Sequence, residues 1–303
     1  AAANKLVMDD KVKFVIGPNG FFGKGSSPTF EANKVLHVSG YNTLQPGEID
    51  SGTPYGFVGY NNPTAMTIVA FKAMKKEFPN VKSTALISAD DGAIPYVIPK
   101  AKKALEDLGF KVIGDVIKFP NELEDFSPIA AKANAITAAD SIRIEMAAPP
   151  ADANILKGLR ALGNQKPFVC NAYAPEILAM AGKEASNNAI INSTYTANQP
   201  GTPPLVDEVF NRGKAPRPFF GMSPNALWML AKVIQAANSL DPAVVKAKWE
   251  SMDTVDTLYG KGTLCGDETY GLHHHAVTHP STYAKLMNGQ VVLGNWIDPG
   301  PIP

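Results

Sequence analysis

The stretch from Val12 to Thr43 constrains the fold more than any other part of the chain. A short apolar run, Phe14 to Ile16, ends at Gly17-Pro18. A glycine-rich aromatic loop, a helix-like segment and a second apolar run, Val35 to Val38, follow it. This order is typical of an open α/β sheet, in which ligands bind outside the carboxyl ends of the strands. Both loops follow such ends, so we expect them to form half of a ligand cleft.

Strand-like and helix-like patterns alternate along the rest of the chain, which predicts mostly parallel sheets with crossover helices. The pattern predicts one helix over Pro99–Leu108, one strand over Lys111–Phe119 and a long helix from Ser223 to Leu240. The apolar residues expected on the buried side of that long helix are Leu227, Leu230, Ala231, Ile234 and Ala237.

Composition narrows the class of protein. The 303 residues suffice for two ordinary domains, and 45% hydrophobic with 18% charged residues can bury a full core. Lys+Arg and Asp+Glu each number 28, so the charge balance gives no reason to expect nucleic acid or an anionic membrane as a partner. No apolar run approaches the roughly 18 residues of a membrane span.

The cysteines and the first residues say little about compartment. Cys170 and Cys265 have no metal-ligand or CxxC spacing and allow one disulfide or none. The start at Ala1 lacks a charged and an apolar region of the kind that a signal peptide carries. Because no strand precedes it, we expect the chain to begin inside a domain, with an upstream segment missing.

Catalytic motifs are not found. Gly23-Lys24 follows a strand but fails the P-loop pattern, since Pro18 replaces the first glycine and Gly25 the Ser/Thr. Backbone N–H groups at this helix start are instead expected to hold a carboxylate. Asp90-Asp91 face apart on an extended chain, so a solvated turn or a helix cap is favoured over a catalytic pair. We expect a protein that is not an enzyme and that needs no cofactor.

Four of the five histidines cluster near the end of the chain, at His273, His274, His275 and His279. In an alternating strand His273 and His275 point one way and His274 the other, so they do not converge. No cysteine or acidic residue nearby completes a clear ligand set. The sequence therefore predicts no metal site here.

The order of three segments carries a family resemblance. VKFVIGP near the start, DDGAIPYVIPKAKKALEDLGFKV in the middle and HHHAVTHPSTYAKLMNGQVVLGNWI at the end resemble the Leu/Ile/Val-binding family of type I periplasmic solute-binding proteins, which serve ABC importers. The likeness covers almost the whole chain. It implies a monomeric extracytoplasmic receptor with an ABC permease as partner and a small-molecule ligand clamped by hinge closure.

The resemblance also implies two α/β lobes, each a mostly parallel sheet flanked by helices, joined by three chain crossings. On this basis lobe I comprises residues 1–62 and 198–277, and lobe II comprises residues 63–197 and 278–303. The family carries a further βαβ unit before the position of Ala1, so lobe I is expected to be incomplete. A ligand-sensing regulatory domain or an α/β enzyme of similar fold is the alternative.

The family's binding loops can be placed on this sequence one by one. Loops of the first lobe hold the ligand carboxylate in the family, through backbone N–H groups and hydroxyls such as that of Thr43. Loops of the second lobe close over the ligand. The expected ligand-binding residues are Gly20, Phe21, Phe22, Tyr41, Asn42, Thr43, Ala93, Ile94, Ala147, Ala148, Ala172, Tyr173 and Phe220.

The last of these loops departs from the family. Amino-acid binders place an acidic residue there to meet the ligand ammonium, whereas this chain has Cys170-Asn171-Ala172-Tyr173. A buried ammonium without a counter-charge costs several kcal/mol. We therefore expect a small carboxylate ligand with an apolar or aromatic body, with an aromatic acid favoured over a branched-chain amino acid. Glu145 restores the amino-acid alternative if its side chain enters the cleft.

Overall fold

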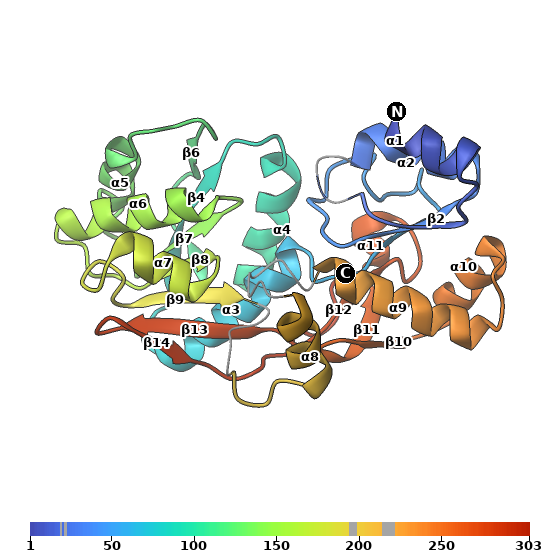
Figure 1. The fold of residues 1–303 in the computed structure, drawn as a ribbon. Helices are drawn as coiled ribbons and strands as arrows, with labels where there is room; N and C mark the ends of the chain where they lie inside the picture. Colours follow the sequence, from blue (N-terminus) through green and yellow to red (C-terminus); the bar gives the residue numbers. More distant parts are fainter. Residues whose placement is uncertain (19, 21–22, 194–198, 214–221) are drawn as a thin grey trace.

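The computed structural model describes residues 1–18, 20, 23–193, 199–213 and 222–303. In this part of the chain two sheets, each with its own helices, lie side by side as two halves (Figure 1). None of the helices described there has the length and apolar character that a bilayer crossing requires.

The first sheet has six strands and lies in the half that contains the N-terminus (Figure 1). In spatial order they are β1 (Phe14–Ile16), β2 (Leu36–Ser39), β3 (Gly56–Val58), β12 (Ala276–Thr278), β11 (Gly260–Cys265) and β10 (Thr254–Thr257). The first four pair in parallel, and the last two add antiparallel edges.

Helices cover both faces of this sheet. The helical segments associated with this half are α1 (Ala2–Asn4), the π-helix Lys5–Asp9, α2 (Gly23–Ala32), α8 (Pro204–Gly213), α9 (Met222–Ala237), α10 (Pro242–Glu250) and α11 (Asp267–Tyr270). On one face α9 and α10 enclose Leu36 and Phe57, and the Phe57 ring stacks on Trp249 with centroids 4.4 Å apart. On the other face α11 packs Tyr270 near Val58.

The second sheet has eight strands, mostly parallel. In spatial order they are β14 (Gln290–Leu293), β13 (Thr282–Met287), β9 (Ala189–Ser193), β8 (Phe168–Asn171), β7 (Ser141–Glu145), β4 (Ser83–Ala89) and β5 (Lys111–Val112), with β6 (Ile117–Phe119) also paired to β4. Only β13 and β14 run antiparallel to their neighbours in the described part.

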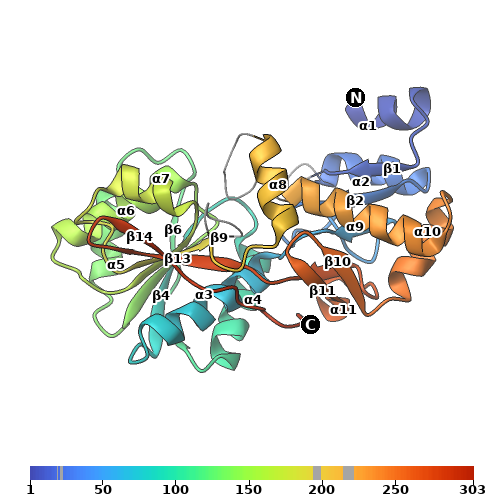
Figure 2. The same ribbon diagram turned by 60° about the horizontal axis from the view of Figure 1, so that its bottom comes forward.

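This second sheet is covered on both sides, and every residue of β4 is buried. Its helices are α3 (Pro63–Glu77), α4 (Ile94–Asp107), α5 (Ser127–Asn134), α6 (Pro149–Ala161) and α7 (Ala174–Ala181). Side chains alternate along a strand, so Leu86 points to the α3/α4 layer and Ile87 to the α5/α6/α7 layer. Figure 2 shows these two layers on opposite sides of the sheet.

The chain passes between the halves three times within this structure, as the family resemblance implied: after β3, between β9 and α9, and between β12 and β13. The first crossing leads directly into α3. Asn62 caps that helix by accepting a hydrogen bond from the Ala65 N–H at 3.0 Å, and Pro63 occupies a first-turn position where no N–H is needed. This local sequence fixes where the second half begins.

Three sequence predictions were wrong in detail. α4 begins at Ile94 and not at Pro99, because Pro95 already supplies a helix start and the helix continues through Pro99. The strand predicted over Lys111–Phe119 is split into β5 and β6, and Gly114 between them has a φ of +75°. The long helix ends at Ala237, and Asn238 after it has a φ of +47°.

The predicted buried face of α9 was also partly wrong. Leu230 is 3% exposed and lies in the core, but Leu227 is 57% exposed, and Ala231 is exposed too. The face that packs on β2 and β10 consists of Ala226, Met229, Leu230 and Val233. The predicted set and the observed set of residues both recur at helical spacing, so periodicity alone did not distinguish the buried face of α9 from the exposed one.

This assignment predicts different costs for two leucines one turn apart. Leu230→Ala should lower the free energy of unfolding by about 2–4 kcal/mol, since it leaves a cavity in the core. Leu227→Ala, the matched control, should change it by less than about 0.5 kcal/mol. Chemical denaturation followed by circular dichroism measures both, and equal losses would contradict the assigned face.

Candidate functional site

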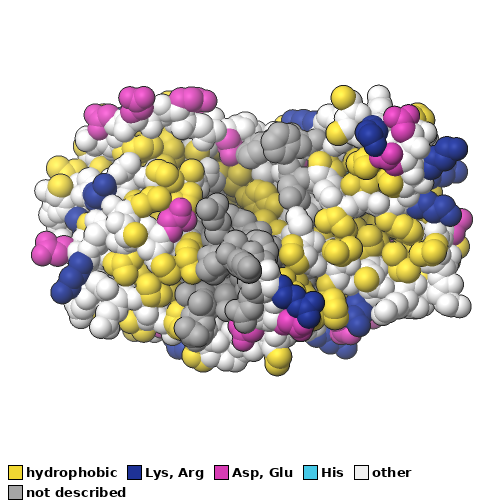
Figure 3. Space-filling model, in the orientation of Figure 1, with side chains coloured by type: hydrophobic (Ala, Val, Ile, Leu, Met, Phe, Trp, Pro, Cys, Tyr) yellow, Lys and Arg dark blue, Asp and Glu magenta, His cyan; other side chains and the backbone are white. Residues whose placement is uncertain are grey.

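A cavity of about 470 Å³ lies where the carboxyl ends of parallel strands from both sheets face each other. The loops after β2, β4, β6, β7 and β8 and the first turns of α3 and α9 supply its walls. The lining residues are Tyr41, Pro63, Met66, Asp91, Asn121, Met146, Ala147, Ala148, Asn171 and Met222. Figure 3 shows hydrophobic side chains along this boundary between the halves.

The walls are mostly apolar. Met66, Met146 and Met222 reach the cavity from α3, the loop after β7 and α9. After Ala148, helix α6 begins with Pro149 and Pro150, which carry no N–H, so its start presents an apolar surface with few donors. An unbranched methionine side chain adapts to the shape of what it contacts. These walls suit a ligand with an apolar body.

Tyr41 connects the two sides of the cavity. Its hydroxyl lies 3.7 Å from the Met146 sulfur, so the end of β2 in one sheet contacts the end of β7 in the other. Burial raises the pKa of Tyr41 far above its usual range, and the negative charges of Glu145, Asp91 and Glu48 add to the shift. Tyr41 therefore stays protonated, and its hydroxyl donates to the Met146 sulfur.

Asn171 is a polar group with a defined orientation. Its Oδ1 accepts hydrogen bonds from Arg143 Nη1 and from Asn192 Nδ2, both at 3.3 Å. These donors turn the oxygen toward the protein interior, so the amide N–H₂ is the part left for the cavity. The side chain thus offers a donor to a ligand.

Arg143 is held by a buried ion pair. Its Nε lies 2.8 Å from Glu145 Oε1, and both side chains are inaccessible to solvent. Glu145 also accepts a hydrogen bond from the Thr67 hydroxyl of α3 at 2.9 Å. The carboxylate therefore points toward α3 and Arg143 compensates its charge, and Glu145 is not among the residues that line the cavity. The amino-acid alternative that relied on Glu145 loses its basis.

Asp91 brings a carboxylate to the cavity that the sequence analysis did not expect there. Its Oδ1 accepts a hydrogen bond from the Ala93 N–H at 2.9 Å, which closes a local turn before α4; the N-cap of α4 is Ala93, without a side-chain cap. The residue also lines the cavity, and burial raises the pKa of its carboxyl group. Asp91 thus closes a turn and also forms part of the cavity wall.

Thr43 is placed differently from the prediction. Its backbone N–H lies 2.7 Å from Glu48 Oε2, and its hydroxyl donates to the other oxygen of the same carboxylate. Burial raises the pKa of Glu48, while the bonds from Thr43 and the charge of Lys24 oppose the shift. The loop does hold a carboxylate, but one that belongs to the protein.

The structure places the remaining predicted residues as follows. Ala147 and Ala148 line the cavity together with Tyr41. Ala93, Ile94 and Ala172 are buried in the cores, and Tyr173 occupies the N-cap position of α7 without a side-chain cap. Asn42 Oδ1 accepts hydrogen bonds from the Leu44 N–H and the Tyr270 hydroxyl, and Gly20 donates its N–H to the Tyr41 carbonyl. Phe21, Phe22 and Phe220 lie outside the described residues.

Sequence reasoning missed several lining residues for identifiable reasons. Asp91 and Asn171 stand in loops that were singled out, but neighbouring residues were chosen. Asn121 follows β6, a strand end that was not considered. Met66 and Met222 lie at helix starts, and only the fold reveals that these turn toward the strand ends.

The histidines also differ from expectation. His273 and His274 lie in a turn after α11, whereas His275 and His279 directly precede and follow β12. Asp267 Oδ2 lies 2.6 Å from His273 Nδ1. An acidic neighbour is therefore present after all. The rings of His273 and His274 stack with centroids 3.7 Å and planes 24° apart. One ligand atom from each of Asp267, His273 and His274 lies within 4.8 Å of the other two, so this group has the spacing of a metal site. His279 is buried, which lowers its pKa to about 4.

Comparison with known proteins identifies the group to which this architecture belongs. The two halves, the three crossings and the cavity between strand ends form the type I periplasmic-binding-protein fold. A family model described as periplasmic binding protein matches residues 1–290, and the chain belongs to this family. No curated protein sequence matches significantly.

Solved structures agree on the fold. A leucine-binding protein, LivK, from Thermotoga maritima has 20% identity and a TM-score of 0.75, with 98% of this chain and 83% of that chain covered. LivJ from Streptococcus pneumoniae, in complex with isoleucine, has 17% identity and a TM-score of 0.74, covering 98% and 82%. A solute-binding protein from Rhodopseudomonas palustris BisB5, in complex with 3,4-dihydroxybenzoic acid, has 14% identity and a TM-score of 0.71, covering 98% and 81%.

A buried acid beside the site gives the protein a pH-dependent stability. Asp152, in the first turn of α6, lies next to the Cys170 thiol. Burial raises its pKa well above the ordinary value, and the charge of Arg143 opposes this shift. The folded protein thus retains a proton that the unfolded chain releases, so its contribution to stability is full below the unfolded pKa and declines as pH rises.

Asp152→Asn removes that decline. The variant should match the parent near about pH 4 and become increasingly more stable than the parent toward about pH 7. Asp140→Asn is a control in which the effect of pH should be reversed, because hydrogen bonds from Lys82 and Ser83 lower the pKa of Asp140. This variant should be less stable than the parent at pH 7, and the difference in stability should disappear in acid. Denaturation midpoints across pH measure both, and an Asp152→Asn variant less stable than the parent at pH 7 would refute the assignment.

Proposed function

We propose that the protein is the extracytoplasmic solute receptor of an ABC importer and binds its ligand without changing it chemically. The periplasmic binding protein family supports an extracytoplasmic location and a small-molecule ligand. The observation that carries the proposal is the cavity between the facing strand ends, with mainly apolar walls and one oriented amide. Segments 1–62 with 198–277, and 63–197 with 278–303, are the two bodies that close on the ligand.

The ligand class we propose is a small carboxylate with an apolar or aromatic body. Met66, Met146 and Met222 receive the body. Because Thr43 already holds Glu48, we assign the ligand carboxylate to the amide of Asn171 and not to Thr43. A relative with the same fold was solved with an aromatic acid, 3,4-dihydroxybenzoic acid, which is in keeping with this class.

An apolar amino acid is the second candidate, favoured by one observation. The carboxylate of Asp91 lines the cavity, where it is suited to meet a ligand ammonium group. Another relative of the same fold was solved with isoleucine. The two candidates differ in whether Asp91 attracts or repels the ligand.

Asn171→Asp tests the assigned carboxylate anchor. Replacing the amide by a carboxylate removes a donor and adds a like charge, so benzoate and hydroxycinnamate affinity should fall about tenfold or more. Asn154→Asp on α6, outside the cavity, is the matched control and should leave affinity unchanged. Isothermal titration calorimetry with benzoate, hydroxycinnamates, leucine and phenylalanine measures these affinities. Tight leucine binding that Asn171→Asp does not change would contradict the proposed ligand class.

Asp91→Asn separates the two candidates. For an aromatic acid without an amine, loss of the negative charge should leave affinity equal or higher. For an amino acid, the same change should weaken binding by about tenfold or more, because a desolvated ammonium loses its partner. The same calorimetric panel decides, and only the first outcome agrees with our primary proposal.

A further inference from the structure

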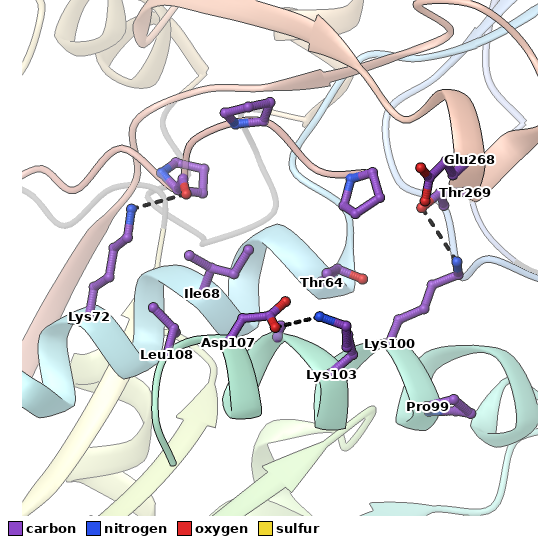
Figure 4. A pocket seen from close by; sticks show the side chains of 14 residues that line it. Thr64, Ile68, Lys72, Pro99, Lys100, Lys103, Asp107, Leu108, Glu268 and Thr269 are labelled. Atoms are coloured by element: carbon purple, nitrogen blue, oxygen red, sulfur yellow. Dashed lines mark hydrogen bonds and ion pairs between the residues drawn. The ribbon is translucent and has the colours of Figure 1, made fainter.

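A second and larger cavity, of about 580 Å³, lies on the far side of α3 from the candidate site. Pro63 and Met66 face the first cavity, whereas Thr64, Ile68 and Lys72, spaced one turn apart, face the second. Helix α4, the start of α11 and the C-terminal segment complete it, so it touches elements of both halves (Figure 4). We call this cavity the α3–α4 groove.

Seven of the fourteen residues that line the α3–α4 groove are apolar. Ile68 of α3, Ala104 of α4 and Leu108 after α4 line the groove, together with the prolines at 299, 301 and 303 of the C-terminal segment, which we call the roof. Proline carries no N–H, so the roof offers no backbone donor at these three positions. A volume in the range of about 300–1,000 Å³ is typical of small-molecule sites.

The roof is fixed to the rest of the protein. Lys72 Nζ lies 2.7 Å from the Asp298 carbonyl oxygen and 3.0 Å from that of Pro299. Ile302 is 3% exposed and anchors the segment in the core, and its carbonyl accepts the Gly266 N–H at 3.2 Å. The groove is therefore a built feature between helices and an anchored segment.

The residues that line the groove differ in whether their charge is compensated by an ion pair. Lys103 forms an ion pair with Asp107, which cancels both. Lys100 reaches only the neutral Thr269 hydroxyl, at 3.4 Å, and Lys72 only neutral carbonyls. Among the described residues neither of these two lysines has a carboxylate partner, while Glu268 is the one lining acid outside the Lys103–Asp107 pair. The lining thus carries an excess of positive charge.

We propose that the α3–α4 groove is a second binding site, for a small amphipathic carboxylate. Its apolar body lies between Ile68, Leu108 and the proline roof, and its carboxylate meets the ammonium group of Lys100. The site is separate from the candidate cleft, because α3 lies between them and different faces of that helix line each. The inference does not depend on which ligand the cleft takes.

Octanoate is the probe, with octylamine as the probe of opposite charge. Both are titrated by calorimetry into the full chain carrying Met66→Trp, which fills the first cavity and leaves the groove as the site observed. Lys100→Gln, added to this background, should weaken octanoate about three- to fivefold, as loss of an exposed ion pair does. Lys102→Gln, a neighbour on α4 that does not line the groove, is the matched control and should have no effect.

Ile68→Trp fills the groove and should abolish octanoate binding, and circular dichroism verifies that this variant folds. Lys100→Gln changes an accessible side chain and therefore tests the proposal independently of Ile68→Trp. Saturable octanoate binding that survives Met66→Trp, weakens with Lys100→Gln and exceeds that of octylamine supports the site. Binding lost with Met66→Trp, binding indifferent to Lys100→Gln, equal binding of octylamine, or no saturable binding at millimolar octanoate overturns it.

Discussion

The buried ion pair between Arg143 and Glu145 is the constraint on which the candidate site depends. Removing one partner would leave an uncompensated charge in the core, which is strongly destabilising, so the pair holds both side chains in place. Arg143 then fixes the amide of Asn171, and Glu145 engages Thr67 of α3. The pair thereby connects the end of β7, the end of β8 and helix α3. An interaction beneath the cavity decides which polar atom faces a ligand.

The protein's own carboxylates define the rest of the cleft chemistry. Glu48 accepts both donors of Thr43, Arg143 compensates the charge of Glu145, and neither carboxylate lines the cavity. Asp91 alone among these acids lines the cavity. The cavity thus offers a hydrogen-bond donor at Asn171 and a carboxylate at Asp91 between apolar walls. These two groups determine whether the ligand has an anionic group, a cationic group or both.

Much of the fold could be predicted from the sequence, because apolar runs ending in loops and alternating with helices leave few alternatives to two α/β sheets. Element ends were less predictable: Pro99 continues α4 although proline is a usual start, and Leu227 and Leu230 share helical spacing with only one buried. The site was predictable to the level of loops. Choosing Asn171 over Ala172, or foreseeing that Glu48 occupies Thr43, requires the direction of each side chain, which tertiary packing sets.

The proposed function requires that the two halves close on a ligand held between their strand ends. Lys132→Cys on α5 and Val244→Cys on α10 place two labels at opposite ends of the molecule (Figure 1), and the native Cys170 and Cys265 are buried. The distance between the labels, measured by spin-label or fluorescence methods, should shorten when the compound that binds most tightly in calorimetry saturates the protein. An unchanged distance with that ligand bound would contradict the account.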